Sequence, residues 1–458
     1  MISPLIQACK DRWYELIPHK VQLKLIKAVA SGVRFPIVPA GRRSGKTERF
    51  KRSVSKESMK LENSGRRYFA GAPTRDQAKR IFWDDLKLLT FSPAHSREPS
   101  ESNLIIYLPN GAEIHLIGFD KPARFEGTPW SGGGIDEFGN LKPDAWAENI
   151  KPALDTVDPR EPDYRPWCWL FGVPEGLNHY YDVADYAENS GDPLFEVFHW
   201  KSAEILPPDV IEAAKRSLSP IQFRQEYEAS FENAAGRIYS DYSKANTTTE
   251  VILPHEQLMW MHDQNYTPLS SAIGVRRSPV DRKGKIKTDK KGRQLPRNQL
   301  YLLDEIILES AVSRQSAMEF VDRYKEHKNR HVLIYGDPAG KQDEKHGQES
   351  AYKSIEDVLR MNNWTFTRKV KKSHPAIKDR QNQVRAKIMN ALGERTLFVN
   401  PNKAKYCHKG LGTVQLKKNS TFLEEDGEFQ HITTAIGYCV DVEWPTKRTL
   451  TQLQISGI

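Results

Sequence analysis

Hydrophobic residues recur in two kinds of short pattern along the first half of the chain. Between Lys20 and Ser31 they return every three or four positions, which predicts an amphipathic helix. Continuous apolar runs predict buried strands at Phe35–Val38, Tyr68–Ala70 and Trp167–Gly172. Because strands and helices alternate, we expect an α/β domain whose sheet is covered by helices.

Three further elements are predicted in this half. The segments Leu104–Leu108 and Ala112–Ile117 flank Pro109-Asn110-Gly111, which is typical of a hairpin turn. A helix is expected through Gln77 to Trp83, and an aromatic-rich helix over Pro220 to Phe231 closes this half.

The chain has 458 residues, which is too long for one compact core and suggests two domains. Apolar density falls over 236–254, where Ser243, Asn246 and Thr247 to Thr249 accumulate. We therefore predict a first domain over 1–235, a linker over 236–254 and a second domain over 255–458. Strands of the second domain are expected at Ser270–Val275, Leu300–Leu308 and Val332–Tyr335.

The segment Ala40–Thr47, AGRRSGKT, directly follows the predicted strand at Phe35. A loop of this kind wraps a phosphate chain in backbone N–H groups at the start of a helix. Lys46 would add a point charge and the Thr47 hydroxyl would hold Mg²⁺. Ala40 stands where the usual spacing has a glycine, and the alternative is a basic loop that caps a surface helix. The predicted nucleotide-binding residues of the loop are Gly41, Arg42, Arg43, Ser44, Gly45, Lys46 and Thr47.

Two adjacent carboxylates, Asp136 and Glu137, are the predicted partners of this loop. Asp136 would lie in the magnesium shell and Glu137 would act as the general base, since neighbouring strand residues point in different directions. The preceding Gly132 to Gly134 replaces most of the usual apolar strand, and an Asp-Glu pair in a loop is common.

Three arginines and one glutamine are candidates for contacts with the nucleotide. Arg42 and Arg43 lie inside the loop, where a guanidinium can reach a γ-phosphate. Arg124 could stabilise transferred charge in a neighbouring subunit, although an ordinary surface salt bridge is an equal alternative. Gln22 could bind an adenine edge, a role that few helical glutamines have.

Two aspartates are candidates for a second site. Asp263 precedes a predicted strand and Asp337 ends another, so both could lie at one sheet edge. Carboxylates in that arrangement can share two divalent cations, which would activate water and stabilise the leaving oxygen of a phosphodiester. The alternative is that each aspartate starts a turn.

The charge balance favours a polyanionic partner. Lys and Arg number 68 against 59 Asp and Glu, for a net charge of +9. A basic loop over 276–297 is either a solvated hairpin tip or a DNA contact. Its basic residues are Arg276, Arg277, Arg282, Lys283, Lys285, Lys287, Lys290, Lys291, Arg293 and Arg297. Four dispersed cysteines predict reduced thiols, and no apolar segment predicts a membrane span or an exported protein.

In their order along the chain, these segments resemble the large subunit of the phage DNA-packaging terminase. The landmarks are Gly41 to Thr47, Ala72-Pro73-Thr74, Arg124 with Gly127, Asp136-Glu137, Gly172 to His179, Asp263, Gly336-Asp337-Pro338 and His431 to Tyr438. The resemblance implies an N-terminal packaging ATPase with a RecA-like parallel sheet and a C-terminal nuclease with a ribonuclease H-like mixed sheet. It also implies that Gly172 to His179 is a coupling motif that senses hydrolysis, and that Arg124 acts on a neighbour.

The chain departs from that family in two places. Thr434 stands where an aspartate usually completes the nuclease metal site, and a hydroxyl cannot replace a bidentate carboxylate at similar affinity. Asp441, on the same helix, is the candidate metal ligand in its place, with His431 and Glu305 as further neighbours. Val173 stands where the coupling motif often has a hydroxyl.

The resemblance implies ATP-driven translocation of double-stranded viral DNA into a procapsid, with metal-dependent cleavage of the concatemer. The implied cofactors are ATP, Mg²⁺ at the ATPase site and two Mg²⁺ or Mn²⁺ at the nuclease site. The implied partners are DNA, the terminase small subunit, the portal protein and further copies of the chain. These copies would form a ring, a pentamer, in the host cytoplasm, and the free chain would be a monomer. Two alternatives are a helicase or translocase without a nuclease, and a DNA-binding scaffold whose second half has lost its metal.

Overall fold

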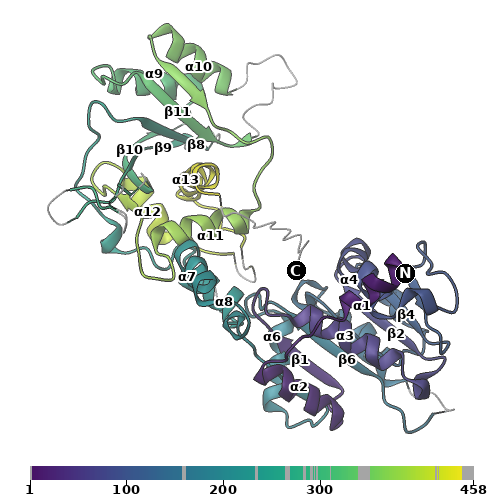
Figure 1. The fold of residues 1–458 in the computed structure, drawn as a ribbon. Helices are drawn as coiled ribbons and strands as arrows, with labels where there is room; N and C mark the ends of the chain where they lie inside the picture. The colour runs from purple at the N-terminus through teal and green to yellow at the C-terminus, as the bar shows by residue number, and fades with distance from the viewer. Residues whose placement is uncertain are drawn as a thin grey trace. The chain divides into compact units, whose positions relative to one another are not determined.

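The computed structural model describes residues 3–156, 161–232, 236–263, 269–281, 285–288, 292, 294–295, 298–309, 311–338, 351–417, 420 and 422–445. The chain forms two compact units (Figure 1). The first is Met1–Glu212 with Phe223–Asn233, and the second is Ala213–Gln222 with Ala234–Ile458. Both are α/β units, as the sequence predicts. Across the described residues, no helix has the length and apolar character needed to cross a membrane.

The first unit contains a seven-stranded sheet in the order β3-β4-β2-β5-β6-β1-β7. All neighbours pair in parallel except the edge strand β3, which is antiparallel to β4. The strands are β1 Phe35–Pro39, β2 Arg67–Ala72, β3 Ile105–Tyr107, β4 Glu113–Gly118, β5 Gly132–Ile135, β6 Trp167–Gly172 and β7 Phe195–Val197. The helices before the unit boundary are α1 Pro4–Arg12, α2 Lys20–Ala30, α3 Lys46–Ser58, α4 Arg75–Leu89, α5 Lys151–Asp155 and α6 His179–Asn189.

Both faces of this sheet are covered, which explains its continuous apolar strands. On one face, Val38 of β1 packs in a cluster with Phe50 of α3 and Phe82 of α4. On the other face, Ile37 shares a cluster with Tyr180 of α6. Successive strand residues therefore enter opposite cores, as the pleat requires.

Most elements predicted for the first half are confirmed, including the hairpin between β3 and β4. The predicted helix over Pro220 to Phe231 is too long. Helix α8 covers Pro220–Tyr227, because Ala229 adopts a left-handed φ of 57° and the Ser230 N–H bonds back to the Arg224 carbonyl at 3.1 Å.

The second unit contains a six-stranded mixed sheet in the order β12-β11-β8-β9-β10-β13. Strands β8, β9 and β10 form an antiparallel meander, and the remaining pairs are parallel. The strands are β8 Leu258–Asp263, β9 Leu269–Arg277, β10 Gln299–Leu308, β11 His331–Gly336, β12 Thr365–Arg368 and β13 Leu397–Val399.

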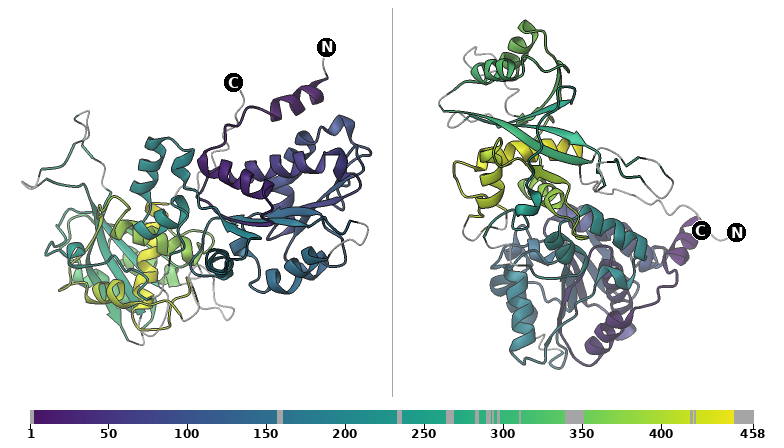
Figure 2. Two further views of the ribbon diagram at one scale, coloured as in Figure 1. Left: turned by 90° about the horizontal axis from the view of Figure 1, so that it is seen from below. Right: turned by 90° about the vertical axis from the view of Figure 1, so that its left-hand side faces the viewer.

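Helices cover both faces of the second sheet as well (Figures 1 and 2). Helices α9 Ser313–Arg323 and α10 Ala351–Met361 supply Phe320 and Leu359 to the core on one face. Helices α11 Ile377–Ile388, α12 Lys405–Thr413 and α13 Gln430–Glu443 pack on the other. The three strands predicted for this half are confirmed, whereas no pattern predicts β8.

The predicted linker, 236–254, instead begins as part of the second unit. Ile238 and Tyr239 are buried in its core. Polar Asn246 is also buried, because its Nδ2 donates to the carbonyls of Ile388 and Leu397, both at 2.9 Å. The boundary between the units falls within α7 Pro208–Ser217 and α8. The predicted domain bounds, 1–235 and 255–458, stay a prediction.

Candidate functional site

The predicted phosphate loop is a strand-loop-helix connection, as expected. It leaves β1 at Pro39 and enters α3 at Lys46. Gly45 adopts a left-handed φ of 76° immediately before the helix, a conformation that glycine reaches without a side-chain clash. Gly41 lies so close to the chain that an added Cβ would approach Ser202 Oγ to 2.4 Å. Both glycines are therefore required by the shape of the loop.

Residues that follow β7 hold the loop in place. The Gly41 N–H donates to the Trp200 carbonyl at 3.0 Å, and the Trp200 indole donates to Ser44 Oγ at 2.7 Å. Ser202 Oγ donates to the Arg42 carbonyl at 2.7 Å. Sequence reasoning missed Trp200 and Ser202, since no local motif marks a segment that lies 160 residues along the chain from Arg42.

Asp136 and Glu137 both face the loop. Thr47 Oγ1 donates to Asp136 Oδ2 at 2.8 Å, and Lys46 Nζ lies 4.0 Å from Glu137 Oε1. Burial raises the pKa of both carboxyl groups, against the opposing charge of Lys46. Glu137 has a left-handed φ of 53°, which turns it away from the strand direction. The two acids therefore contact different residues of the loop.

The glycines before Asp136 are explained by aromatic rings on both sides of β5. An added Cβ at Gly133 would approach Cδ1 of the Phe69 ring to 2.5 Å. At Gly134 it would approach Phe50 Cε2 to 2.5 Å. The strand is thus a buried one in which neighbouring side chains fill the space that an apolar residue would occupy.

The remaining first-half candidates lie in different environments. Gln22 is buried at 1% exposure, and its Nε2 has no hydrogen-bond partner within the described structure. That atom would lie 3.5 Å from a Cβ added at Gly45. Arg42 is exposed and pairs with Glu226 at 2.7 Å, while Arg43 is exposed with a φ of 56°. Arg124 is exposed on the short 3₁₀ helix Pro122–Phe125.

The predicted coupling segment contacts the residues that follow Glu137. Asn178 Nδ2 donates to the Gly139 carbonyl at 3.0 Å, and His179 Nε2 lies 3.0 Å from the Phe138 carbonyl. Gly172 packs against Glu137 itself, since an added Cβ would lie 3.2 Å from the Glu137 Cα. The segment Gly172 to His179 is therefore in contact with the acidic loop at both ends.

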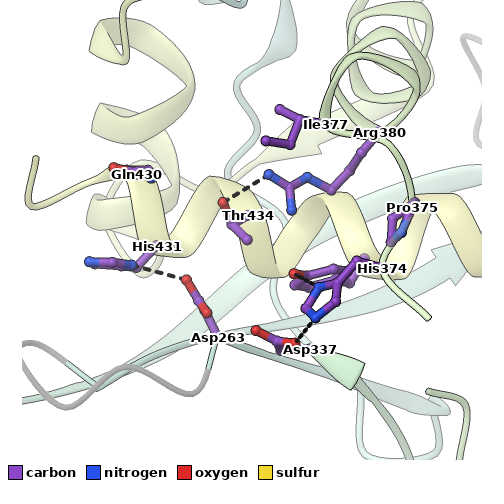
Figure 3. Close-up of a pocket in the computed structure, with 10 residues that line it drawn as sticks. Asp263, Asp337, His374, Pro375, Ile377, Arg380, Gln430, His431 and Thr434 are labelled. Atoms are coloured by element: carbon purple, nitrogen blue, oxygen red, sulfur yellow. Dashed lines mark hydrogen bonds and ion pairs between the residues drawn. The ribbon is translucent and has the colours of Figure 1, made fainter. Parts of the chain in front are cut away.

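In the second unit, Asp263 and Asp337 line one open pocket of about 340 Å³ (Figure 3). Asp263 ends β8, and Asp337 directly follows β11. These parallel strands pair His262 with Gly336, so each aspartate directly follows a residue of the last pair in the register. The other residues lining the pocket are His374, Pro375, Ile377, Arg380, Gln430, His431, Thr434 and Tyr438.

Each aspartate has a histidine beside it (Figure 3). His431 Nδ1 lies 3.0 Å from Asp263 Oδ2, a hydrogen bond that raises the pKa of His431. His374 Nε2 lies 3.5 Å from Asp337 Oδ1. Within the described residues, His, Cys, Asp and Glu side chains do not gather in groups of three or more that suit a metal ion.

Of the candidates for the third ligand, the structure brings His431 to this pocket but neither Asp441 nor Glu305. Asp441 is buried elsewhere on α13 with Lys371 at 2.5 Å and Gln383 at 3.1 Å. Glu305 accepts the backbone N–H groups of Tyr406 and Cys407 at the start of α12. Thr434 does line the pocket, but with a hydroxyl in place of the expected carboxylate.

The base of the predicted basic loop is neutralised by acidic residues. Arg276 pairs with Glu443, and Arg277 lies 2.7 Å from Glu256. Further along, Lys285 and Lys287 are exposed. The other basic residues of the loop, Arg282, Lys283, Lys290, Lys291, Arg293 and Arg297, lie outside the described residues.

Comparisons with known proteins find the fold through structure alone. No protein-family model matches the sequence, and no curated protein matches it. The structure is similar to that of the large terminase from a thermophilic bacteriophage, with a TM-score of 0.56 and 15% identity over 93% of this chain and 99% of that one. The same phage protein in complex with ADP gives a TM-score of 0.55 at 16% identity, with the same coverage of both chains. The chain therefore has the fold of the large terminase structures, as the resemblance of its motifs predicts.

Proposed function

We propose that this chain is a terminase large subunit. Its first unit would hydrolyse ATP to move double-stranded viral DNA into a procapsid, and its second unit would cut concatemeric DNA. One observation carries the proposal. A phosphate loop with two facing acids and a separate carboxylate pocket occur on one chain that has the fold of a bacteriophage large terminase.

In the first unit, the loop would bind the phosphates of ATP. Backbone N–H groups at the start of α3 and the Lys46 ammonium are suited to a polyphosphate. The Thr47 hydroxyl and the Asp136 carboxylate are hard oxygen donors 2.8 Å apart, so they fit Mg²⁺. Bound there, the ion would neutralise charge that develops on the phosphates.

Glu137 would orient the attacking water and accept its proton. Its exposure is greater than that of Asp136, so water can reach it. The carbonyls of Phe138 and Gly139 bond to His179 and Asn178, so displacement of Glu137 would also displace α6. This contact supports the coupling role that the resemblance implies.

In the second unit, Asp263 and Asp337 would hold the divalent cation that assists phosphodiester hydrolysis. Exposed Lys285 and Lys287 are suited to the DNA backbone, which a translocating motor contacts without regard to sequence. The exposure of Arg124 fits a residue that acts on the next subunit of a ring. The small subunit, the portal protein and the host cytoplasm belong to the same proposal.

The experiment uses two variants of the full chain. Lys46→Ala should lower ATP turnover about 10²-fold or more, because it removes a charge from the transferred phosphate, and should leave plasmid cleavage unchanged. Asp337→Asn should abolish metal-dependent cleavage and leave ATP turnover unchanged. The matched controls are Lys24→Ala and Asp322→Asn, which alter exposed residues of the same units. Retained ATP turnover in Lys46→Ala refutes the loop assignment.

A second candidate function has an observation in its favour. Thr434 occupies the place of an expected acid, which favours an ATP-dependent translocase or helicase whose second unit binds DNA without cutting it. The wild-type chain would then show DNA-stimulated ATP turnover, with no cleavage of plasmid in Mg²⁺ or Mn²⁺.

A further inference from the structure

An arginine shares the second-unit pocket with the two aspartates. Arg380, on α11, lines the pocket together with Asp263 and Asp337. Its Nη2 donates to Thr434 Oγ1 at 3.3 Å, and Figure 3 shows the guanidinium directed at that hydroxyl. Thr434 stands where the resemblance expects an acid, and its neutral hydroxyl is hydrogen-bonded to the Arg380 guanidinium.

Contacts on three sides fix the Arg380 side chain. Its aliphatic part lies against Gly437, where an added Cβ would approach Arg380 Cγ to 2.6 Å. The guanidinium carbon lies 5.0 Å from the centre of the Tyr438 ring. Glu424 Oε1 is 3.6 Å from Nη2, and both side chains are at least nine-tenths buried. The guanidinium is therefore held in one position, as a binding group must be.

The donor set does not fit the two-cation site that the resemblance implies. Two cations need several shared carboxylates, and among the described residues two carboxylates line the pocket. A second cation on the Thr434 side would also lie next to the positively charged guanidinium of Arg380. Its binding is opposed by charge repulsion and by the missing ligand together.

We infer that the pocket holds one divalent cation, on Asp263 and Asp337, and that Arg380 replaces the second cation by binding an oxygen of the scissile phosphate. The planar guanidinium suits this role, since it donates parallel hydrogen bonds to phosphate oxygens. The inference rests on the proposed nuclease function of the second unit.

Counting bound Mn²⁺ tests the first part. Electron paramagnetic resonance on the nucleotide-free full chain should find one tightly bound Mn²⁺, which Asp337→Asn removes. Two ions on the wild-type chain, both removed by Asp337→Asn, would overturn the inference and leave the proposed nuclease standing. No bound ion would overturn both the inference and the metal-dependent nuclease.

Two variants test whether Arg380 excludes the second ion. Thr434→Asp should still bind one Mn²⁺, because the new carboxylate would pair with Arg380 Nη2. Combining Thr434→Asp with Arg380→Gln should raise the count to two, since the acid is then free to bind the ion. A second ion in Thr434→Asp alone would show that Arg380 does not replace it.

Plasmid cleavage tests the phosphate contact. Arg380→Gln is combined with Glu424→Gln, so that no buried carboxylate is left without its partner. Cleavage should fall about 10²–10³-fold with the Mn²⁺ affinity unchanged, because a phosphate-binding group is lost. Wild-type cleavage by this folded double variant would overturn the role of Arg380.

Arg380→Lys serves if thermal unfolding shows that the double variant does not fold. It keeps the charge beside Glu424 and loses the planar fork, so cleavage should fall about tenfold or more while Mn²⁺ binding is kept. Full cleavage by Arg380→Lys would overturn the contact between the guanidinium fork and the phosphate.

Discussion

Replacing Gly134 by alanine tests why a glycine strand leads into the catalytic acids. An added Cβ would lie 2.5 Å from Phe50 Cε2 and 2.9 Å from Phe50 Cδ2. Carbon atoms in favourable contact are about 3.5 Å apart, so the ring would have to retreat by about 1 Å. Phe50 is fully buried and packs against the Phe82, Trp169 and Phe171 rings, so these contacts oppose that shift.

The magnitude follows from two opposing effects. Overpacking a core of this kind costs about 1–3 kcal/mol. The lower backbone entropy of the unfolded alanine chain returns about 0.5–1 kcal/mol. We therefore expect Gly134→Ala to destabilise the first unit by about 1–2 kcal/mol. For a unit of this size that lowers the melting temperature by about 2–8 °C. ATP turnover should fall as well, because Asp136 is only two residues further along the chain.

Differential scanning calorimetry of the full chain measures the effect, and Phe50→Leu supplies the matched control. Phe50→Leu alone should destabilise the same transition by about 1 kcal/mol, because it leaves a small cavity. In the double variant the penalty of Gly134→Ala should largely disappear, with a coupling energy of about 1–2 kcal/mol. An unchanged melting temperature for Gly134→Ala, or a penalty that Phe50→Leu does not relieve, refutes the steric explanation.

Three further predictions concern the two units. The kcat/KM for ATP should fall with decreasing pH, with a midpoint above the ordinary carboxyl range near pH 4.3. Burial raises the pKa of Glu137, and the protonated acid cannot accept a proton from water. A fall in kcat/KM with its midpoint at or below that range would contradict this prediction. Trp200→Phe should raise the KM for ATP and destabilise the first unit by about 1–3 kcal/mol, since Ser44 loses its indole donor; calorimetry and steady-state kinetics check both. Burial raises the pKa of Glu443, but hydrogen bonds from Lys369 and Tyr335 outweigh that effect and hold the pKa below its usual value. The charged Glu443 therefore stabilises the fold above the unfolded pKa, and this stabilisation is lost as the pH falls through the lower folded pKa. Glu443→Gln should therefore lower the free energy of unfolding of the second unit by about 1–3 kcal/mol at pH 7 and by much less below about pH 4, with allowance for the partly exposed partners Arg276 and Lys369. Urea denaturation measures this difference, and an equal loss at both pH values would argue against the charge cluster.

Local patterns predict much of the fold because they reflect local physics. The loop Ala40–Thr47 is recognisable because glycine, lysine and threonine at that spacing match the shape and charge of a phosphate chain. By contrast, no pattern predicts β8, and the polar segment around Asn246 is typical of a linker although it is buried. Its amide is satisfied only by carbonyls of Ile388 and Leu397, more than 140 residues away.

By itself the sequence determined which chemical groups are available: a phosphate loop, the acids Asp136 and Glu137, the pair Asp263 and Asp337, and a threonine at 434. Only the tertiary structure decided which of them meet. Parallel pairing of β8 and β11 places Asp263 beside Asp337, while Asp441 is held by Lys371 away from their pocket. It also placed Arg380 at Thr434, because α11 and α13 pack together across a glycine at 437. Contacts between distant segments depend on packing, which no local pattern encodes.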